Sequence, residues 1–123
     1  MKKSNLAELS VDELVDRYIE IGVAQEEAIF NLQNARYNRL FDLMIDIEQE
    51  LKFRTGDQRR ALLQLLRHSN IQVRLNGARA TLAVDRQAAR QALQGIADSR
   101  QFPQAGDAGM SLHNLDEGVF KPT

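Results

Sequence analysis

Residues 70–80 read Asn-Ile-Gln-Val-Arg-Leu-Asn-Gly-Ala-Arg-Ala, and this stretch decides the fold. Asn70 is a residue type that accepts hydrogen bonds from the free backbone N–H groups at the start of a helix. Further along, Gly77 and Ala78 have almost no side chain, so another helix can approach closely. The stretch therefore predicts a helix that begins after Asn70 and packs tightly against a neighbour.

The segments on either side extend this helix into a hairpin. Asp57 is placed to cap a helix over 58–67, and Asp85 is placed to cap another over 86–98. The central helix is predicted to run over 71–84. Because the connections are short, consecutive helices should be antiparallel neighbours. The expected inward-facing residues of the two flanking helices are Ala61, Leu62, Leu65, Leu66, Ala89, Ala92, Leu93 and Ile96.

The N-terminal half predicts two further helices. Ser10 and Glu13 form the sequence of a capping box, which marks a helix start. A second helix is expected over about 35–53, with Gly56 ending it in a left-handed turn. The polar run at 31–34 favours a turn, but one continuous bent helix remains an alternative. The expected core residues are Val11, Leu14, Val15, Tyr18, Ile21, Gly22, Ala28, Ile29 and Leu32, followed by Tyr37, Leu40, Phe41, Met44, Ile47 and Leu51.

The C-terminal segment looks less regular. Residues 102–109 contain Pro103, Gly106 and Gly109 and are predicted as a loop, with a short helix over 110–116 after it. The segment still carries apolar residues, so it is expected to pack back onto the helices. These residues are Phe102, Met110, Leu112, Leu115, Val119 and Phe120.

Composition limits the cellular setting and the chemistry. The chain has 123 residues, of which 43% are hydrophobic and 27% charged, and it has no cysteine. It has no apolar run of about 18 residues, and its opening Met-Lys-Lys-Ser-Asn-Leu is not followed by an apolar segment. A soluble cytoplasmic protein with no membrane contact is therefore expected. Residues 1–54 hold 11 acids and 7 bases, whereas residues 55–100 hold 3 acids and 8 bases.

Two resemblances follow from these motifs. Residues 57–98 resemble a HEAT repeat followed by the first helix of another, with Val73-Arg74 and Gly77-Ala78 at the family's characteristic positions. The whole chain resembles a bacterial family known as domain of unknown function 2019. That resemblance rests on Tyr37-Asn38-Arg39-Leu40, on Val73-Arg74-Leu75 and on residues 102–110. It implies a right-handed superhelix of α-helices and brings no activity with it.

The prediction for the fold is accordingly a single all-α domain over 1–123. It should be a short, HEAT-like α-α superhelix of five or six helices. Its expected parts are an N-terminal helix pair over about 10–54, a HEAT-like hairpin and following helix over 57–98, and a C-terminal loop and short helix over 99–123.

No catalytic, cofactor or metal site is predicted. A metal needs three or four converging ligands, and His113 is the one residue that could be named as a ligand. His68 is expected to form a local hydrogen bond at its turn. Asp42 and Asp46 share a helix face, but an ordinary solvated surface explains them. The arginines of residues 55–100 are expected to serve as solvated surface and intramolecular partners, Arg74 among them as a structural donor.

The function predicted from the sequence is a non-enzymatic module that binds a protein. The partner is either a second copy of this chain or a different protein, and nucleic acid is not expected. Asn76, Arg79, Asp107 and His113 form the possible interaction surface, because they are expected to be exposed on one helix and on the C-terminal loop. A nucleic-acid binder that uses the arginine-rich middle and an enzyme with an unrecognised site remain alternatives.

Overall fold

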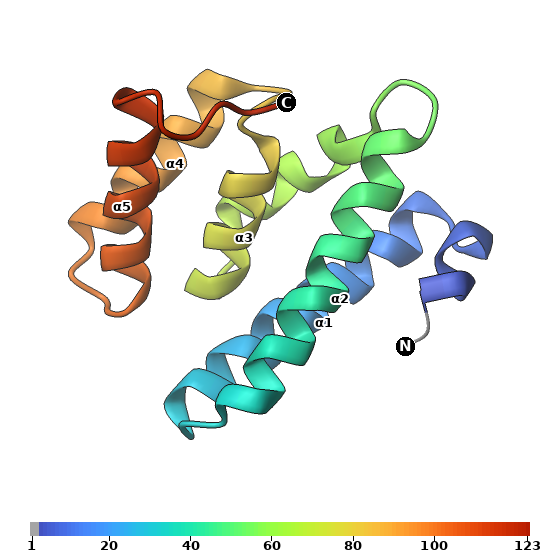
Figure 1. Cartoon of the computed structure of the whole chain (residues 1–123), viewed down its shortest axis with the longest axis horizontal. Coiled ribbons are helices and arrows are strands. Elements are labelled where there is room, and N and C mark those ends of the chain that lie inside the picture. Colours follow the sequence, from blue (N-terminus) through green and yellow to red (C-terminus); the bar gives the residue numbers. More distant parts are fainter. Residues whose placement is uncertain (1–2) are drawn as a thin grey trace. The chain divides into compact units, whose positions relative to one another are not determined.

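The structure, a computed structural model, describes residues 3–123, and within that range its regular elements are all helices, with no strand among them. The prediction of an all-α fold is confirmed. Met1 and Lys2 of the N-terminal segment lie outside the described residues. The elements in chain order (Figure 1) are the 3₁₀-helix η1 (Lys3–Glu8), α1 (Val11–Phe30), α2 (Asn34–Phe53), the 3₁₀-helix η2 (Gln58–Arg67), α3 (Ile71–Thr81), α4 (Arg86–Asp98) and α5 (Gln104–Asp116).

The contacts within the chain divide it into two compact units, Met1–Ala61 and Leu62–Thr123. The first unit is built from η1, α1 and α2, and the second from α3, α4 and α5, while η2 runs from one unit into the other. The single domain and the superhelix stay predictions.

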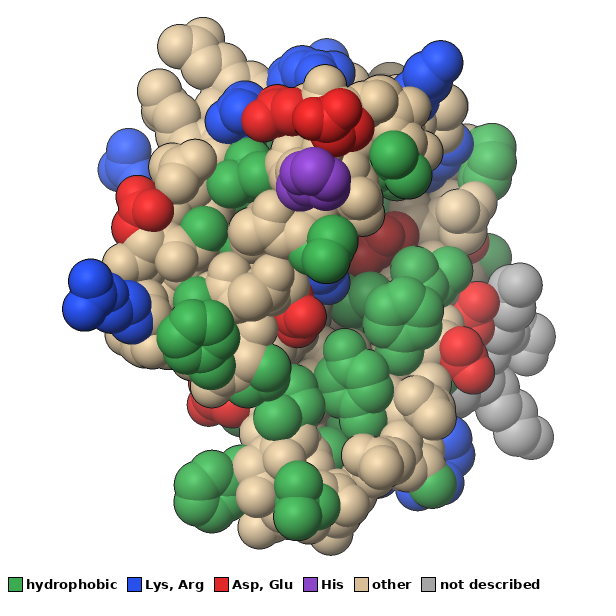
Figure 2. Space-filling model, turned by 60° about the vertical axis from the view of Figure 1, so that its left-hand side comes forward, with side chains coloured by type: hydrophobic (Ala, Val, Ile, Leu, Met, Phe, Trp, Pro, Cys, Tyr) green, Lys and Arg blue, Asp and Glu red, His purple; other side chains and the backbone are tan. Residues whose placement is uncertain are grey.

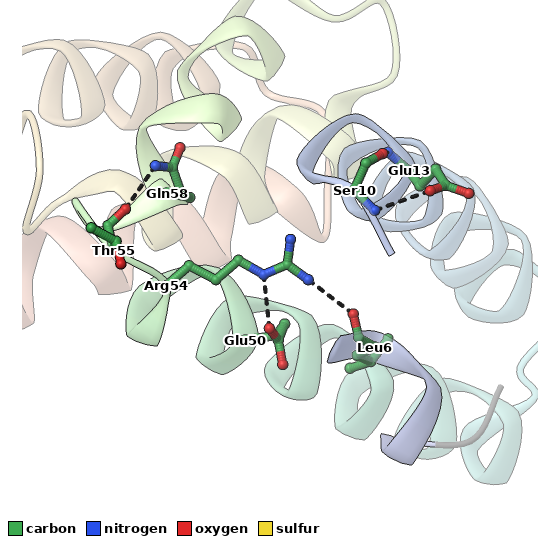
Figure 3. Close-up of polar contacts among 7 residues, drawn as sticks. All are labelled: Leu6, Ser10, Glu13, Glu50, Arg54, Thr55 and Gln58. Carbon is green, nitrogen blue, oxygen red and sulfur yellow. Dashed lines mark hydrogen bonds and ion pairs between the residues drawn. The ribbon is translucent and has the colours of Figure 1, made fainter. Parts of the chain in front are cut away.

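The start of α1 has the predicted capping box. The Glu13 backbone N–H donates to Ser10 Oγ at 3.1 Å, and the Ser10 N–H donates to the Glu13 carboxylate at 3.0 Å (Figure 3). The hydrogen bonds from the Ser10 backbone and then from its side chain hold the pKa of Glu13 below its ordinary value. The helix therefore begins where the sequence indicates.

Helices α1 and α2 are separate, which decides between the two alternatives for residues 31–34. They form an antiparallel hairpin whose core contains Leu14, Tyr18, Ile47 and Leu51, all fully buried. Tyr18 Oη donates to Glu48 Oε2 at 2.7 Å, so the buried ring also fixes α1 to α2 through its hydroxyl. Six predicted core residues are less buried: Val11, Ile29, Tyr37 and Leu40 are half-buried, and Leu32 and Phe41 are exposed.

Polar contacts close the first unit where α2 ends. Arg54 donates from Nε to Glu50 at 2.8 Å and from a terminal nitrogen to the Leu6 carbonyl at 3.0 Å, which ties η1 to α2 (Figure 3).

In the turn that follows α2, Gly56 has the predicted left-handed conformation, with φ +82°. Hydrogen bonds from the Arg59 guanidinium to Asp57 hold the pKa of that carboxyl below its usual value.

The N-terminus of α3 confirms the reading of Asn70. Asn70 Oδ1 accepts hydrogen bonds from the N–H groups of Gln72 and Val73 at 2.9 and 3.1 Å. Arg74 donates to the His68 carbonyl at 2.9 Å, and His68 Nδ1 accepts from the Asn70 N–H at 3.0 Å. Arg74 and His68 are thus structural, as predicted. Helix α3 ends at Thr81 rather than at 84, because residues 82–84 form a turn before Asp85 caps α4.

Gly77 has the role that the sequence assigns to it. A Cβ atom placed there would lie 3.0 Å from Leu65 Cβ and 3.5 Å from the Leu62 carbonyl oxygen. A side chain at this position would therefore collide with η2, so glycine is what allows η2 and α3 to approach closely.

The prediction of a loop over 102–109 is wrong for most of its length. Helix α5 begins at Gln104 and includes Gly106 and Gly109. A glycine inside a helix costs about 1 kcal/mol relative to alanine, but α5 buries Ala105, Ala108, Leu112 and Leu115. Most of these residues join the core residues of α3 and α4, including Leu75, Leu93 and Ile96. This burial outweighs the weak helix propensity of the segment.

The C-terminal apolar residues divide into two groups. Leu112 and Leu115 are buried, as expected for a segment that packs back. The same expectation is wrong for four others, which are exposed in the structure: Phe102, Met110, Val119 and Phe120.

Candidate interaction surfaces

The first candidate is the surface predicted on α3 and the C-terminal segment, and its centre is buried. Asn76, for which the sequence predicts exposure, is only 3% exposed, so that expectation is wrong. Its Oδ1 accepts from Gln72 Nε2 at 3.0 Å, and Gln72 Oε1 accepts from Gln104 Nε2 at 3.0 Å. All three amides are buried. They form a hydrogen-bonded chain that links α3 to α5.

Arg79 is half-buried and also links α3 to α5. Its Nε donates to Ser111 Oγ at 2.9 Å, and a terminal nitrogen donates to the Asp107 carbonyl at 3.3 Å. Asp107 itself is half-buried, whereas His113 is exposed. The structure brings Arg79 and Asp107 together, but it uses the arginine to hold the fold. A role of Arg79, Asp107 and His113 in contacting a partner stays a prediction.

Arginines of the predicted basic middle are also used internally. Arg59 pairs with Asp57 at 2.7 Å and Arg90 with Asp116 at 2.7 Å. Arg74 and Arg79 donate to the groups already described. Four others lie on η2, at the start of α4 and before α5, and all are exposed: Arg60, Arg67, Arg86 and Arg100. The positive charge available to a phosphate backbone is therefore about half of what the sequence suggests.

Within residues 3–123 no group of three or more His, Asp or Glu side chains is placed to hold a metal ion. Of the two carboxylates expected on a solvated surface, Asp42 is exposed and Asp46 is half-buried. Over the same range, no helix has the length and apolar character needed to cross a membrane.

The second candidate is a surface that the sequence reasoning missed, at the turn between α1 and α2. The Gln33 N–H donates to the Ala28 carbonyl at 2.8 Å and the Leu32 N–H donates to the Ile29 carbonyl at 3.2 Å, which is a Schellman motif. The residue that takes the left-handed conformation in this motif is usually glycine. Here it is Leu32, with φ +55°.

Leu32 is unusual for a second reason, since its side chain is 85% exposed. The left-handed conformation costs a residue with a Cβ about 1–2 kcal/mol. Neither backbone conformation nor burial therefore explains a leucine at this position. Phe30, two residues earlier, is 86% exposed. The turn thus presents two large apolar side chains to solvent.

Further exposed apolar residues continue from the turn along both helices. On α1, Val23 lies seven residues before Phe30 and therefore on the same side of the helix. On α2, Phe41 and Ile45 are exposed and four residues apart. We define the hairpin surface as Val23, Phe30, Leu32, Phe41 and Ile45.

The two helix stripes face different directions. Val23 is two residues from the buried Ile21 and from the buried Gln25, so it and Phe30 lie on the side of α1 opposite its buried residues. Ile45 is one residue from the buried Met44, so Phe41 and Ile45 lie beside the buried side of α2. Hydrophobic side chains gather in the lower part of Figure 2, the part of the view where Figure 1 places the α1–α2 turn.

A sequence signal for the hairpin surface does exist. The first helix has more apolar positions than one buried stripe requires, and Leu32 occupies the position after a helix where glycine or asparagine is usual. Leu32 and Phe41 also fit the spacing of the core residues, so helical periodicity alone does not separate them from the core.

Comparisons with other proteins agree with the fold and assign no chemistry to either surface. The family model described as "Domain of unknown function (DUF2019)" matches residues 12–116. The fold is similar to a crystal structure of the protein RPA1889 from Rhodopseudomonas palustris CGA009, with a TM-score of 0.94 and 48% sequence identity, over 96% of this chain and 98% of that chain. No protein with a curated description matches the chain.

Proposed function

Because the chain belongs to the DUF2019 family, whose description assigns no activity, we propose a function from its surfaces: it is a non-enzymatic module that binds another protein. The hairpin surface is the binding site. The setting that we propose is the bacterial cytoplasm.

The observation that carries this proposal is the conformation and exposure of Leu32. A leucine held at positive φ with 85% of its surface exposed lowers the stability of the turn and gains no burial in return. Phe30, Val23, Phe41 and Ile45 extend the exposed apolar area on the same hairpin. Large apolar side chains that gather exposed at one turn are typical of sites where proteins associate.

Two features favour a protein partner over nucleic acid. The hairpin surface is apolar and lies on the acidic half of the chain, which a nucleic acid would avoid. Four of the eight arginines that would attract nucleic acid are engaged within the fold.

The test is affinity capture from the native cell with matched variants. Leu32→Gly suits the left-handed conformation, so its thermal stability should not fall. We expect Leu32→Gly and Phe30→Ser to reduce the recovery of specific partners by at least about tenfold, which corresponds to about 1.4 kcal/mol of binding free energy.

The control is Phe102→Ser, which removes a similarly exposed aromatic ring from the segment before α5. It should capture partners as the natural chain does. Equal recovery with all three variants, or loss only with Phe102→Ser, would contradict the proposed function.

A further inference from the structure

Asn76 and Gly77 form the only Asn-Gly pair in the sequence. Such a pair is chemically labile, because the backbone nitrogen of a glycine, which has no side chain to hinder it, can attack the amide carbon of the preceding asparagine. The fold requires both residues for other reasons. A Cβ at position 77 would lie 3.0 Å from Leu65 Cβ, and Asn76 belongs to the buried amide chain. The packing of α3 therefore places two mutually reactive residues side by side.

The reaction is the deamidation of asparagine, and it has two steps. In the first, the Gly77 nitrogen forms a bond to Asn76 Cγ, and the side-chain nitrogen leaves as ammonia with the proton that the Gly77 N–H gives up. The product is a cyclic succinimide. In the second, water adds to either ring carbonyl and opens the ring, which leaves aspartate or isoaspartate at position 76. Water is the co-reactant, so the conversion proceeds without an enzyme or a cofactor.

Native α3 blocks the first step. Both residues lie in the interior of the helix (Ile71–Thr81), where the Gly77 N–H donates to the carbonyl one turn earlier. Asn76 Oδ1 accepts from Gln72 Nε2 at 3.0 Å, which holds the amide that would be attacked. Asn76 is also only 3% exposed, so water has little access to it. Attack on Asn76 Cγ therefore requires that α3 opens.

The native fold does not accommodate the products. Aspartate at position 76 could still accept from Gln72, but it replaces the NH₂ donor of Asn76 with an oxygen and brings a negative charge into a buried site. Burying a charge without a partner is costly, and the two arginines of α3, Arg74 and Arg79, donate to other groups. Isoaspartate adds a carbon to the main chain and so disrupts the hydrogen bonding of the helix. Either product therefore weakens α3.

We propose that Asn76–Gly77 is a latent deamidation site, which the native fold protects and at which an unfolded chain loses the ability to regain native α3. The modification marks chains that have stayed unfolded and makes their unfolding irreversible. The inference concerns the second unit, Leu62–Thr123, and is independent of the hairpin surface.

The experiment compares the full chain in buffer with the same chain unfolded in guanidinium chloride, both at mildly alkaline pH. Trypsin cleaves after Arg74 and Arg79, so residues 75–79 are released as one peptide. Chromatography separates its aspartate and isoaspartate forms, and mass spectrometry identifies them. We expect the unfolded chain to form both products, and the native chain to form them at least about a hundredfold more slowly, because core helices open rarely.

Three variants test the cause of these rates. In guanidinium chloride, where folding is not required, Gly77→Ala should slow the reaction by about tenfold or more, since a Cβ hinders the attacking nitrogen. In buffer, Gln72→Leu should accelerate it by about tenfold or more, because the hydrogen bonds that hold Asn76 and Gln104 are lost and α3 opens more often. The matched control Gln94→Leu, which removes an exposed hydrogen bond from α4, should leave the rate in buffer unchanged.

Refolding tests the loss of the native fold. Chains that have partly reacted are diluted from denaturant, and folded molecules are separated from unfolded ones by size-exclusion chromatography. The folded fraction should contain at least about tenfold less of the isoaspartate peptide than the unfolded fraction. Three results would overturn the inference: equal reaction rates in the native and unfolded chains, no reaction at Asn76 in the unfolded chain, or equal isoaspartate content in the two fractions after refolding.

Discussion

Replacing Gln72 with leucine is expected to lower the free energy of unfolding by about 2–4 kcal/mol. Gln72 donates to Asn76 and accepts from Gln104, and all three side chains are buried. The substitution removes both hydrogen bonds and leaves two buried polar groups without the partner that Gln72 supplies. Each such group costs about 1–3 kcal/mol. Urea unfolding followed by circular dichroism measures the change.

The control for this prediction is Gln94→Leu. Gln94 also donates to a side chain, Asp98 at 3.0 Å, in a hydrogen bond that is exposed to solvent. Its substitution should change the free energy of unfolding by less than about 0.5 kcal/mol. If Gln72→Leu and Gln94→Leu had the same small effect, the buried amide chain would not stabilise the contact between α3 and α5.

Gly77→Leu is expected to destabilise the chain by about 3 kcal/mol. Even a Cβ atom at this position would lie 3.0 Å from Leu65 Cβ, so the longer side chain forces η2 and α3 apart. Overpacking of a well-packed core typically costs about 1–3 kcal/mol. Thermal and urea unfolding both measure the effect.

Gly95 provides the matched control, because it also lies in a helix. A Cβ atom added there would have no atom within 4 Å apart from its chain neighbours and the backbone of its own helix. Gly95→Ala should raise the free energy of unfolding by about 0.5–1 kcal/mol, since alanine restricts the unfolded chain and favours the helix. Opposite signs for Gly77→Leu and Gly95→Ala are therefore expected. A stable Gly77→Leu variant would contradict the close approach of η2 to α3.

The sequence predicted best those features that depend on neighbouring residues. The helix starts at Ser10, Asn70 and Asp85 are each confirmed by a side-chain hydrogen bond to the backbone of the first turn. Capping depends on side chains two or three positions away, so short-range reasoning suffices. The close contact at Gly77 was also predictable, because Gly77 and Ala78 together leave room on the helix surface for a neighbouring element.

Features that depend on distant residues were not predictable in the same way. Gly106 and Gly109 suggest a loop, but α5 is helical because Ala105, Ala108 and two leucines are buried in the second unit. Asn76 has a polar side chain, and only the position of Gln72 and Gln104 makes its burial possible. These outcomes follow from the packing of α3, α4 and α5.

The hairpin surface was missed for a related reason. Hydrophobic periodicity identifies apolar residues but does not say which of two adjacent stripes is covered. The core of the hairpin takes Met44 and Ile47 and leaves Phe41 and Ile45 outside. The backbone conformation of Leu32 is likewise a property of the folded turn.

Photocrosslinking in the native cell tests the central claim most directly. The photoreactive residue p-benzoylphenylalanine replaces Phe30 or Phe41 on the hairpin surface, or the exposed Gln94 on α4. A protein bound at the hairpin surface predicts crosslinks to a defined partner from positions 30 and 41 and none from position 94. A crosslink from position 94 alone, or no crosslink from positions 30 and 41 in a chain that is folded and present, would contradict the account.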